Sequence, residues 1–187
     1  MALLGRTLGT IACTLAMWMV TAAAVAADKR ISLPTGDTLT ISGWRDGWVV
    51  GIAPDDSPAG SVVFHAADPT KWRAMLAPMP ANPALTGDVG NLRIYVRNMA
   101  RALENGGLVV EHEQKAIDPS GVRGFYVKAH DPNPALHAKS KEEMYQDGYT
   151  GALTVGSKPY LFEIAWNQGG EAEANAVLGL MKAMRMQ

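Results

Sequence analysis

Two histidines and an aspartate in one short segment are the residues best suited to bind a metal ion. His130 and Asp131 are adjacent, and His137 follows six positions later. Zinc accepts imidazole and carboxylate ligands, but a zinc site needs a third or fourth ligand held in place. The three residues therefore form a weak candidate metal site, and a solvated loop is the alternative. His65, near Asp68, could join them only if the fold brought it close.

The fourth histidine has carboxylates on both sides. His112 stands between Glu111 and Glu113, in a segment whose composition predicts a strand. Neighbouring side chains of a strand point to opposite faces, so His112 cannot readily share a metal with both glutamates. We expect an exposed strand face here.

The sequence lacks a recognisable nucleophile motif or phosphate-binding loop. It has no Gly-x-Ser-x-Gly pattern, and its one cysteine, Cys13, lies in the N-terminal apolar run. Asp55 and Asp56 are adjacent carboxylates in a loop rich in Pro and Gly, without the apolar surroundings that raise a catalytic carboxyl pKa. These features favour a protein that is not an enzyme and that has no cofactor.

A short aromatic and charged turn is the first candidate for a partner-binding surface. Trp44, Arg45, Asp46 and Trp48 lie within five positions, with Gly47 between the last two. Trp and Arg are enriched among the residues that dominate binding energy at interfaces. The alternative is structural, with one tryptophan closing the end of the core and the other shielding a hairpin.

A second candidate segment begins at Trp72. Trp72, Arg73 and Met79 could form an apolar lip beside a proline-fixed loop, which would lose little conformational entropy on binding. The alternative is a segment that fills a groove of its own fold.

The element that must position these residues is a predicted hairpin over 149–166. Tyr160, Phe162, Ile164 and Trp166 alternate with smaller or polar residues, and a Gly-Ser-Lys-Pro turn at 156–159 precedes them. Alternation with period two on both sides of a turn predicts paired strands with one buried face.

Apolar periodicity predicts the other elements. Repeats at three- and four-residue steps predict helices over 89–105 and 171–186. A short helical turn over 68–75, or else an irregular strand, follows the Asp68-Pro69 pair, and 131–141 is expected to be a loop. Strands are predicted over 30–33, 38–42, 48–53, 61–65, 108–117, 122–129, 144–155 and 159–166.

Adjacent hairpins and amphipathic helices together predict an α+β fold. The helices must cover an antiparallel, meandering sheet with their apolar faces, one as a central helix and one at the C-terminus. The length from residue 28 to residue 187 suits a single domain.

The first 27 residues have the pattern of a signal peptide. Arg6 precedes an apolar run over 8–25, and Ala24-Val25-Ala26 fits the small-residue rule for cleavage after Ala26 or Ala27. An uncleaved anchor is the alternative. We expect export to the periplasm with no stable membrane anchor after cleavage, and without cysteine the exported chain must rely on packing.

The charge balance argues against nucleic acid as a partner. The chain has 17 Lys and Arg residues against 18 Asp and Glu residues, whereas nucleic-acid binding calls for an excess of basic residues.

The order of these elements resembles the PsbP-like fold, which includes the bacterial DcrB-type envelope proteins. The resemblance rests on Ile31-Ser32-Leu33-Pro34, on Gly124-Phe125-Tyr126-Val127, on the 151–164 hairpin with Tyr160 and Ile164, and on the last helix. It implies the same sheet covered by two helices, and a binding or assembly module instead of an enzyme.

Together these features favour a non-enzymatic periplasmic module that binds a protein. Its sharpest form is an immunity or inhibitor protein that neutralises an envelope-acting toxin. An envelope assembly or maintenance factor and a carrier of a small molecule or metal are the alternatives.

Overall fold

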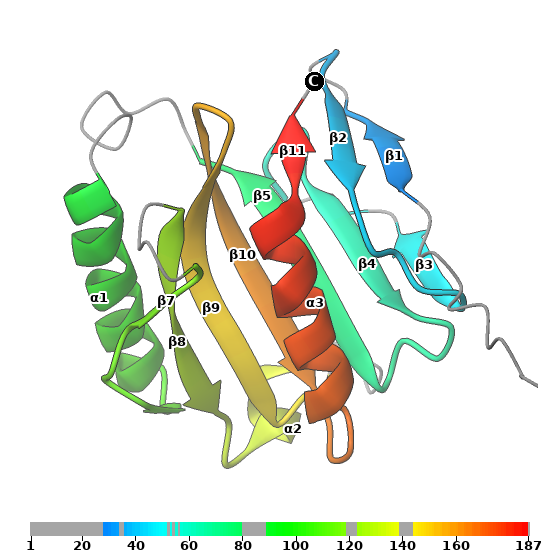
Figure 1. The fold of residues 1–187 in the computed structure, drawn as a ribbon. Helices are drawn as coiled ribbons and strands as arrows, with labels where there is room; N and C mark the ends of the chain where they lie inside the picture. Colours follow the sequence, from blue (N-terminus) through cyan, green and yellow to red (C-terminus); the bar gives the residue numbers. More distant parts are fainter. Residues whose placement is uncertain are drawn as a thin grey trace, which may run out of the picture.

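The structure, a computed structural model, describes residues 28–33, 36–51, 53, 55, 57–79, 89–118, 123–138 and 144–186. Two antiparallel sheets and three helices make up this part of the chain (Figure 1). The elements in chain order are β1 (Lys29–Ser32), β2 (Thr38–Ile41), β3 (Trp48–Gly51), β4 (Val62–Ala66), β5 (Trp72–Pro78), α1 (Val89–Asn105), β6 (Val109–Val110), β7 (Lys115–Ala116), β8 (Gly124–His130), α2 (Pro134–His137), β9 (Asp147–Val155), β10 (Lys158–Trp166), α3 (Glu171–Ala183) and β11 (Arg185–Met186).

The predicted hairpin at 149–166 is confirmed and lies in the middle of the large sheet. That sheet has the order β3-β4-β5-β10-β9-β8-β6, with β7 also paired to β8. Strand β10 is antiparallel to β9 on one side and to β5 on the other. Gly151 faces Phe162 in this register, and a Cβ at Gly151 would lie 2.6 Å from a ring carbon of Phe162. Glycine is therefore required where the aromatic ring crosses the neighbouring strand.

Alternation along β10 divides the core into two layers. Phe162 and Ile164 pack with α3 and the small sheet, whereas Leu161 packs with α1. The large sheet therefore lies between α1 and α3, and the small sheet, of order β1-β2-β11, lies on the α3 side (Figure 1). The α+β fold predicted from the sequence is confirmed.

The two long helices form where the sequence spacing predicts them. Helix α1 spans the predicted residues and buries Leu92, Val96 and Ala100 at intervals of four. Helix α3 buries Val177 and Met181 at the same spacing. Each helix thus places one apolar stripe on the sheet, as the period of 3.6 residues requires.

The helical turn expected over 68–75 is wrong, and the alternative strand is correct. Strand β5 begins at Trp72 and is paired along its length with β10. Asp68 instead stabilises a tight turn, because the Thr70 hydroxyl and backbone N–H both donate to its carboxylate, at 2.6 and 3.1 Å. These hydrogen bonds lower the pKa of Asp68. The described residues before α1 therefore form five strands, one more than the sequence predicts.

Several predicted boundaries also change. The loop expected over 131–141 contains the single turn α2, and the strand expected over 108–117 is reduced to β6 and β7, with 111–114 outside regular structure. The last helix ends at Ala183 instead of residue 186, and β11 then pairs with β2. Pairing with the N-terminal hairpin supplies long-range hydrogen bonds that local periodicity cannot reveal.

Membrane-related features fall partly outside the described residues. The expected signal peptide over 1–27 lies outside them. Within the described residues, no helix has both the length and the apolar character to cross a bilayer.

The end of α3 depends on one side chain from another part of the chain. The Arg123 guanidinium donates to the carbonyl oxygens of Lys182 and Met184, the latter at 3.1 Å. These carbonyls belong to the last turn, where intrahelical partners are missing. Arg123 therefore joins the start of β8 to the junction between α3 and β11.

Replacing Arg123 by alanine is expected to destabilise the C-terminal end of the fold. Loss of hydrogen bonds from a charged donor should lower the free energy of unfolding by about 1–3 kcal/mol. Urea denaturation measures this change, and amide hydrogen exchange should accelerate at Arg185 and Met186. The control, Arg185→Ala, alters an exposed residue of β11, and an equal loss in both variants would contradict the role of Arg123.

Candidate functional site

The segment from Trp44 to Trp48, here called the tryptophan turn, connects the small sheet to the large one. It follows β2 and leads into β3, and Trp48 N–H donates to the Arg45 carbonyl at 3.2 Å. Gly43 and Gly47 have φ angles of +89° and +82°, which residues other than glycine rarely adopt. The two glycines therefore fix the course of the turn.

The tryptophan turn is anchored by a chain of aromatic contacts that reaches the core. Trp48 packs edge-on against Trp44 at 5.8 Å between ring centroids and against Trp72 at 5.0 Å. Trp44 also contacts Phe64 edge-on at 6.2 Å. Edge-to-face pairs gain energy beyond simple burial, so the half-buried rings of Trp44 and Trp48 are held in one orientation.

Charged groups orient the outer side of the turn. The Arg45 guanidinium lies 5.6 Å from the Trp48 ring centroid and 3.3 Å from a carboxylate oxygen of Glu173. The Arg45 and Glu173 side chains are 53% and 43% exposed, and such a pair adds little stability in water. Its effect is to place the Arg45 guanidinium over the half-buried Trp48 indole without burying the charge.

A cleft of about 430 Å³ opens between the tryptophan turn and the start of α3. Trp48 contributes aromatic surface above the buried Trp72, and Lys71 and Glu173 contribute opposite charges. The residues 168–170 complete one side. An aromatic cleft with charges of both signs suits the insertion of a side chain from a partner protein.

The seven predicted partner-binding residues do not form one surface. Trp72 is 1% exposed beneath Trp48, and Met79 is 7% exposed in the layer that packs with α1. Arg73 follows Trp72 in β5 and therefore points to the opposite face of the sheet. The structure therefore does not contain the apolar lip expected from Trp72, Arg73 and Met79. The regular pairing of β5 buries or separates these residues. Trp44, Arg45, Asp46 and Trp48 remain together in the tryptophan turn.

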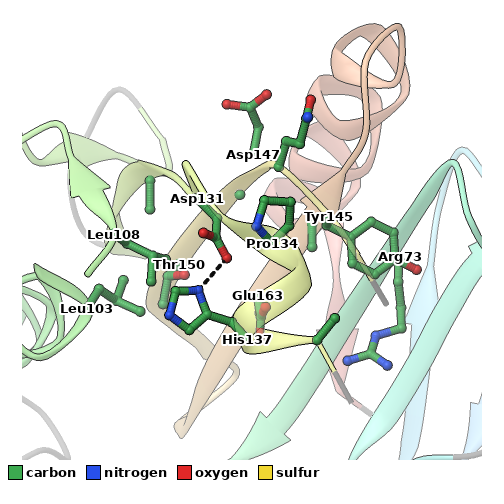
Figure 2. Close-up of a pocket in the computed structure, with 15 residues that line it drawn as sticks. Arg73, Leu103, Leu108, Asp131, Pro134, His137, Tyr145, Asp147, Thr150 and Glu163 are labelled. Carbon is green, nitrogen blue, oxygen red and sulfur yellow. Dashed lines mark hydrogen bonds and ion pairs between the residues drawn. The ribbon is translucent and has the colours of Figure 1, made fainter. Parts of the chain in front are cut away.

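The other face of the sheet carries a second cavity, here called the histidine cavity, also of about 430 Å³ (Figure 2). Its floor comes from β5, β8, β9 and β10, and its walls from the end of α1, from α2 and from Tyr145. Small residues on adjacent strands leave room for it, namely Ala129, Gly148 and Ala165. Arg73, Thr150 and Glu163 supply polar groups.

Within the histidine cavity, Asp131 orients His137. A carboxylate oxygen of Asp131 lies 2.7 Å from Nδ1 of His137, and the other oxygen accepts the Asn133 backbone N–H at 2.8 Å. A carboxylate can only accept here, so Nδ1 carries the proton. In that tautomer Nε2 is an acceptor and can receive a hydrogen bond from a bound molecule.

The candidate metal residues are divided between two pairs. Nδ1 of His130 lies 3.0 Å from a carboxylate oxygen of Asp147, its register partner on β9. This pair is separate from the pair of Asp131 and His137, and Figure 2 shows Asp147 apart from the latter. In the part of the chain that the structure describes, no three His, Cys, Asp or Glu residues are grouped closely enough to hold a metal. The three residues proposed from the sequence thus do not converge.

The remaining two histidines have local partners. Nδ1 of His65 lies 2.6 Å from the Ala66 carbonyl oxygen, and Nε2 of His112 lies 2.8 Å from Glu104. His112 is 73% exposed, as expected, but it lies in the irregular 111–114 segment and not in a strand. Its partner comes from α1 instead of either neighbouring glutamate.

Sequence reasoning missed both concave sites as wholes. The histidine cavity is built from five separate segments, and its clearest sequence signal is the run of small residues at matching strand positions. The cleft beside the tryptophan turn depends on residues 168–170, which follow the end of β10. They lie more than a hundred positions after Trp48 in the sequence. The pairing of β3, β4, β5 and β10 in one sheet brings Trp48 close to residues 168–170.

No protein-family model matches the sequence, and no curated protein matches it as a relative. Solved structures that match include cyanobacterial PsbP (CyanoP) from Synechocystis, at 14% identity and TM-score 0.47, covering 89% of this chain and 96% of that one. A point mutant of Mog1 matches at 10% identity and TM-score 0.48, covering 86% and 95%. The Ran-binding protein Mog1p from Saccharomyces cerevisiae matches at 9% identity and TM-score 0.48, covering 87% and 95%. A PsbP structure is thus among the structures that this chain resembles, in agreement with the PsbP-like fold expected from the sequence. The likeness concerns the fold alone.

Two substitutions in the tryptophan turn should differ sharply in their effect on stability. Trp44→Ala removes a half-buried ring that contacts Trp48 and Phe64, and should lower the free energy of unfolding by about 2–3 kcal/mol. Arg45→Ala removes an exposed ion pair and should cost less than about 1 kcal/mol. Urea denaturation followed by tryptophan fluorescence measures both. A larger loss for Arg45→Ala than for Trp44→Ala would contradict this description of the turn.

Proposed function

We propose that the chain is a non-enzymatic module that binds a protein partner through the tryptophan turn and the adjacent cleft. The observation that carries the proposal is the placement of Trp48 in the wall of the cleft, with Arg45 next to its ring. Trp72 supports the Trp48 ring from below, and Glu173 restrains Arg45 from the side. A surface fixed before binding loses less entropy when a partner docks.

Export to the periplasm belongs to the same proposal. The pattern of residues 1–27 supports it. In its sharpest form, the module is an immunity or inhibitor protein that neutralises an envelope-acting toxin. An envelope assembly or maintenance factor would use the same surface for a different partner.

The partner interaction can be tested with a charge reversal that leaves the fold intact. Affinity capture with the tagged full chain, followed by mass spectrometry, identifies candidates, and calorimetry with each purified candidate measures binding. Arg45→Glu should weaken a one-to-one complex by about tenfold or more, because it places a carboxylate beside Glu173 at the cleft. The control is Arg30→Glu, an equal charge change on exposed β1.

Three outcomes separate the forms of the proposal. Protection of cells from a co-expressed toxin, lost with Arg45→Glu, would support the immunity form. A deletion phenotype in the absence of any toxin would favour the assembly factor. Equal binding by wild type and Arg45→Glu to every captured partner would reject the tryptophan turn as the binding surface.

The histidine cavity favours a second candidate function, the carriage of a small molecule. Its volume lies in the range of small-molecule sites, and it combines apolar walls with an oriented imidazole. Native mass spectrometry of the full chain should then detect a bound molecule whose occupancy falls severalfold in His137→Ala. His112→Ala changes an exposed histidine outside the cavity and serves as the control. Identical spectra for the wild type and both variants would exclude this function.

A further inference from the structure

Helix α1 carries three arginines on one exposed face. Arg93, Arg97 and Arg101 recur at every fourth position, and all three are exposed. Residues four apart on a helix lie one above the other, about 6 Å apart along the axis. Their guanidinium groups therefore form a line of positive charge, here called the arginine row.

Among the residues that the structure describes, few groups neutralise the arginine row. Glu104 is the only acidic residue of α1, and it pairs with His112 at 2.8 Å. Among the described residues, no ion pair joins Arg97 or Arg101 to a carboxylate, and Arg93 lies over the Phe125 ring at 5.4 Å. Like charges at four-residue spacing destabilise an isolated helix. The repulsion between these arginines therefore lowers the stability of α1, and the ion pairs of the described residues do not compensate for it.

The row is a local exception to the charge of the chain. Its three members belong to a total of 17 Lys and Arg residues, and the other fourteen are outnumbered by 18 Asp and Glu residues. A positive line on an otherwise acidic protein orients an approaching acidic partner toward that line.

A groove of about 540 Å³ runs beside the row, between α1 and the 111–114 segment. Its wall is tied to the helix because Gln114 donates from its side-chain nitrogen to the Arg93 carbonyl at 3.2 Å. The opposite face of α1 is buried through Leu92 and Val96, both fully enclosed. The row therefore stands on a rigid support beside a concave surface.

We propose that this groove binds an acidic helical segment of a protein partner. A helix with carboxylates at every fourth position repeats the 6 Å spacing of the row, and each guanidinium can hold a carboxylate through two hydrogen bonds. Glu104 and Glu113 also line the groove. We therefore expect the partner helix to have no carboxylates at the positions that face these two glutamates. The groove lies on the other side of the sheet from the tryptophan turn, and the inference does not rest on the function proposed above.

The surroundings of the row favour a protein over a lipid surface. Adsorption of a helix to a membrane requires several apolar side chains that enter the bilayer. Ile94, at 53% exposure, is the one exposed large apolar residue of α1 among the described side chains. A concave surface also suits a rod-shaped helix better than it suits a planar lipid surface.

The test uses a designed peptide as the probe. An alanine-based helix of about twenty residues is long enough to form in water, and it carries glutamate at three successive four-residue steps. A second peptide has glutamine at those positions, and a third keeps the glutamates but contains central prolines that prevent a helix. Fluorescence anisotropy measures binding to the full chain at low and at higher salt. Vesicles of phosphatidylglycerol and phosphatidylcholine are tested in parallel.

We expect the helical glutamate peptide to bind best, with an affinity that falls as salt rises. Arg97→Glu with Arg101→Glu should weaken this binding by about tenfold or more, and Arg97→Gln with Arg101→Gln should weaken it less. The matched control is Arg30→Glu with Arg185→Glu, which makes the same charge change on the exposed small sheet. Circular dichroism verifies that each variant is folded.

Three results would overturn the proposal. Equal weakening by the control pair would show an effect of net charge alone. Equal binding of the helical and proline-containing peptides, or no binding of either, would reject a helical occupant. Binding to the anionic vesicles that needs Arg97 and Arg101, with no binding to the peptide, would assign the row to a lipid surface instead.

Discussion

The antiparallel pairing of β10 with β9 and β5 is the constraint on which the rest of the structure depends. Strand β10 is paired with β9 along its whole length and with β5 from Tyr160 to Trp166, and it is packed on both faces. Its alternation assigns Phe162 and Ile164 to the layer under α3 and Leu161 to the layer under α1. A shift of one residue would exchange these faces and place aromatic rings where α1 now packs. One register therefore determines both core layers.

This division of the sheet also divides the surfaces on which function can be built. The tryptophan turn and its cleft belong to the α3 side, where Trp48 rests on the buried Trp72. The histidine cavity and the arginine row belong to the α1 side, supported by small floor residues and by the buried stripe of the helix. Adjacent residues of β5 contribute to different sides, so that Trp72 supports the first site and Arg73 lines the second cavity.

The connections between distant segments account for the corrections to the predicted elements. The last helix ends early because β11 gains a partner in β2 and because Arg123 satisfies carbonyls at the helix end. The helical turn after Asp68 is replaced by a strand because β10 offers a complete edge to β5. In both cases a long-range hydrogen-bonding partner outweighs a local preference, which is worth only a fraction of a kilocalorie per residue.

The sequence by itself determined the elements whose periodicity is long and whose turns are marked by glycine or proline. The β9–β10 hairpin, the span of α1, the α+β class and the compact turn around Arg45 all follow from such local patterns. Only the tertiary structure decided that His130 pairs with Asp147 while His137 pairs with Asp131, that Trp72 and Met79 are core residues, and that Arg93, Arg97 and Arg101 border a groove. Those outcomes depend on which strand edges and helix faces meet, and the contacts between them join residues far apart in the chain, where local spacing carries no information.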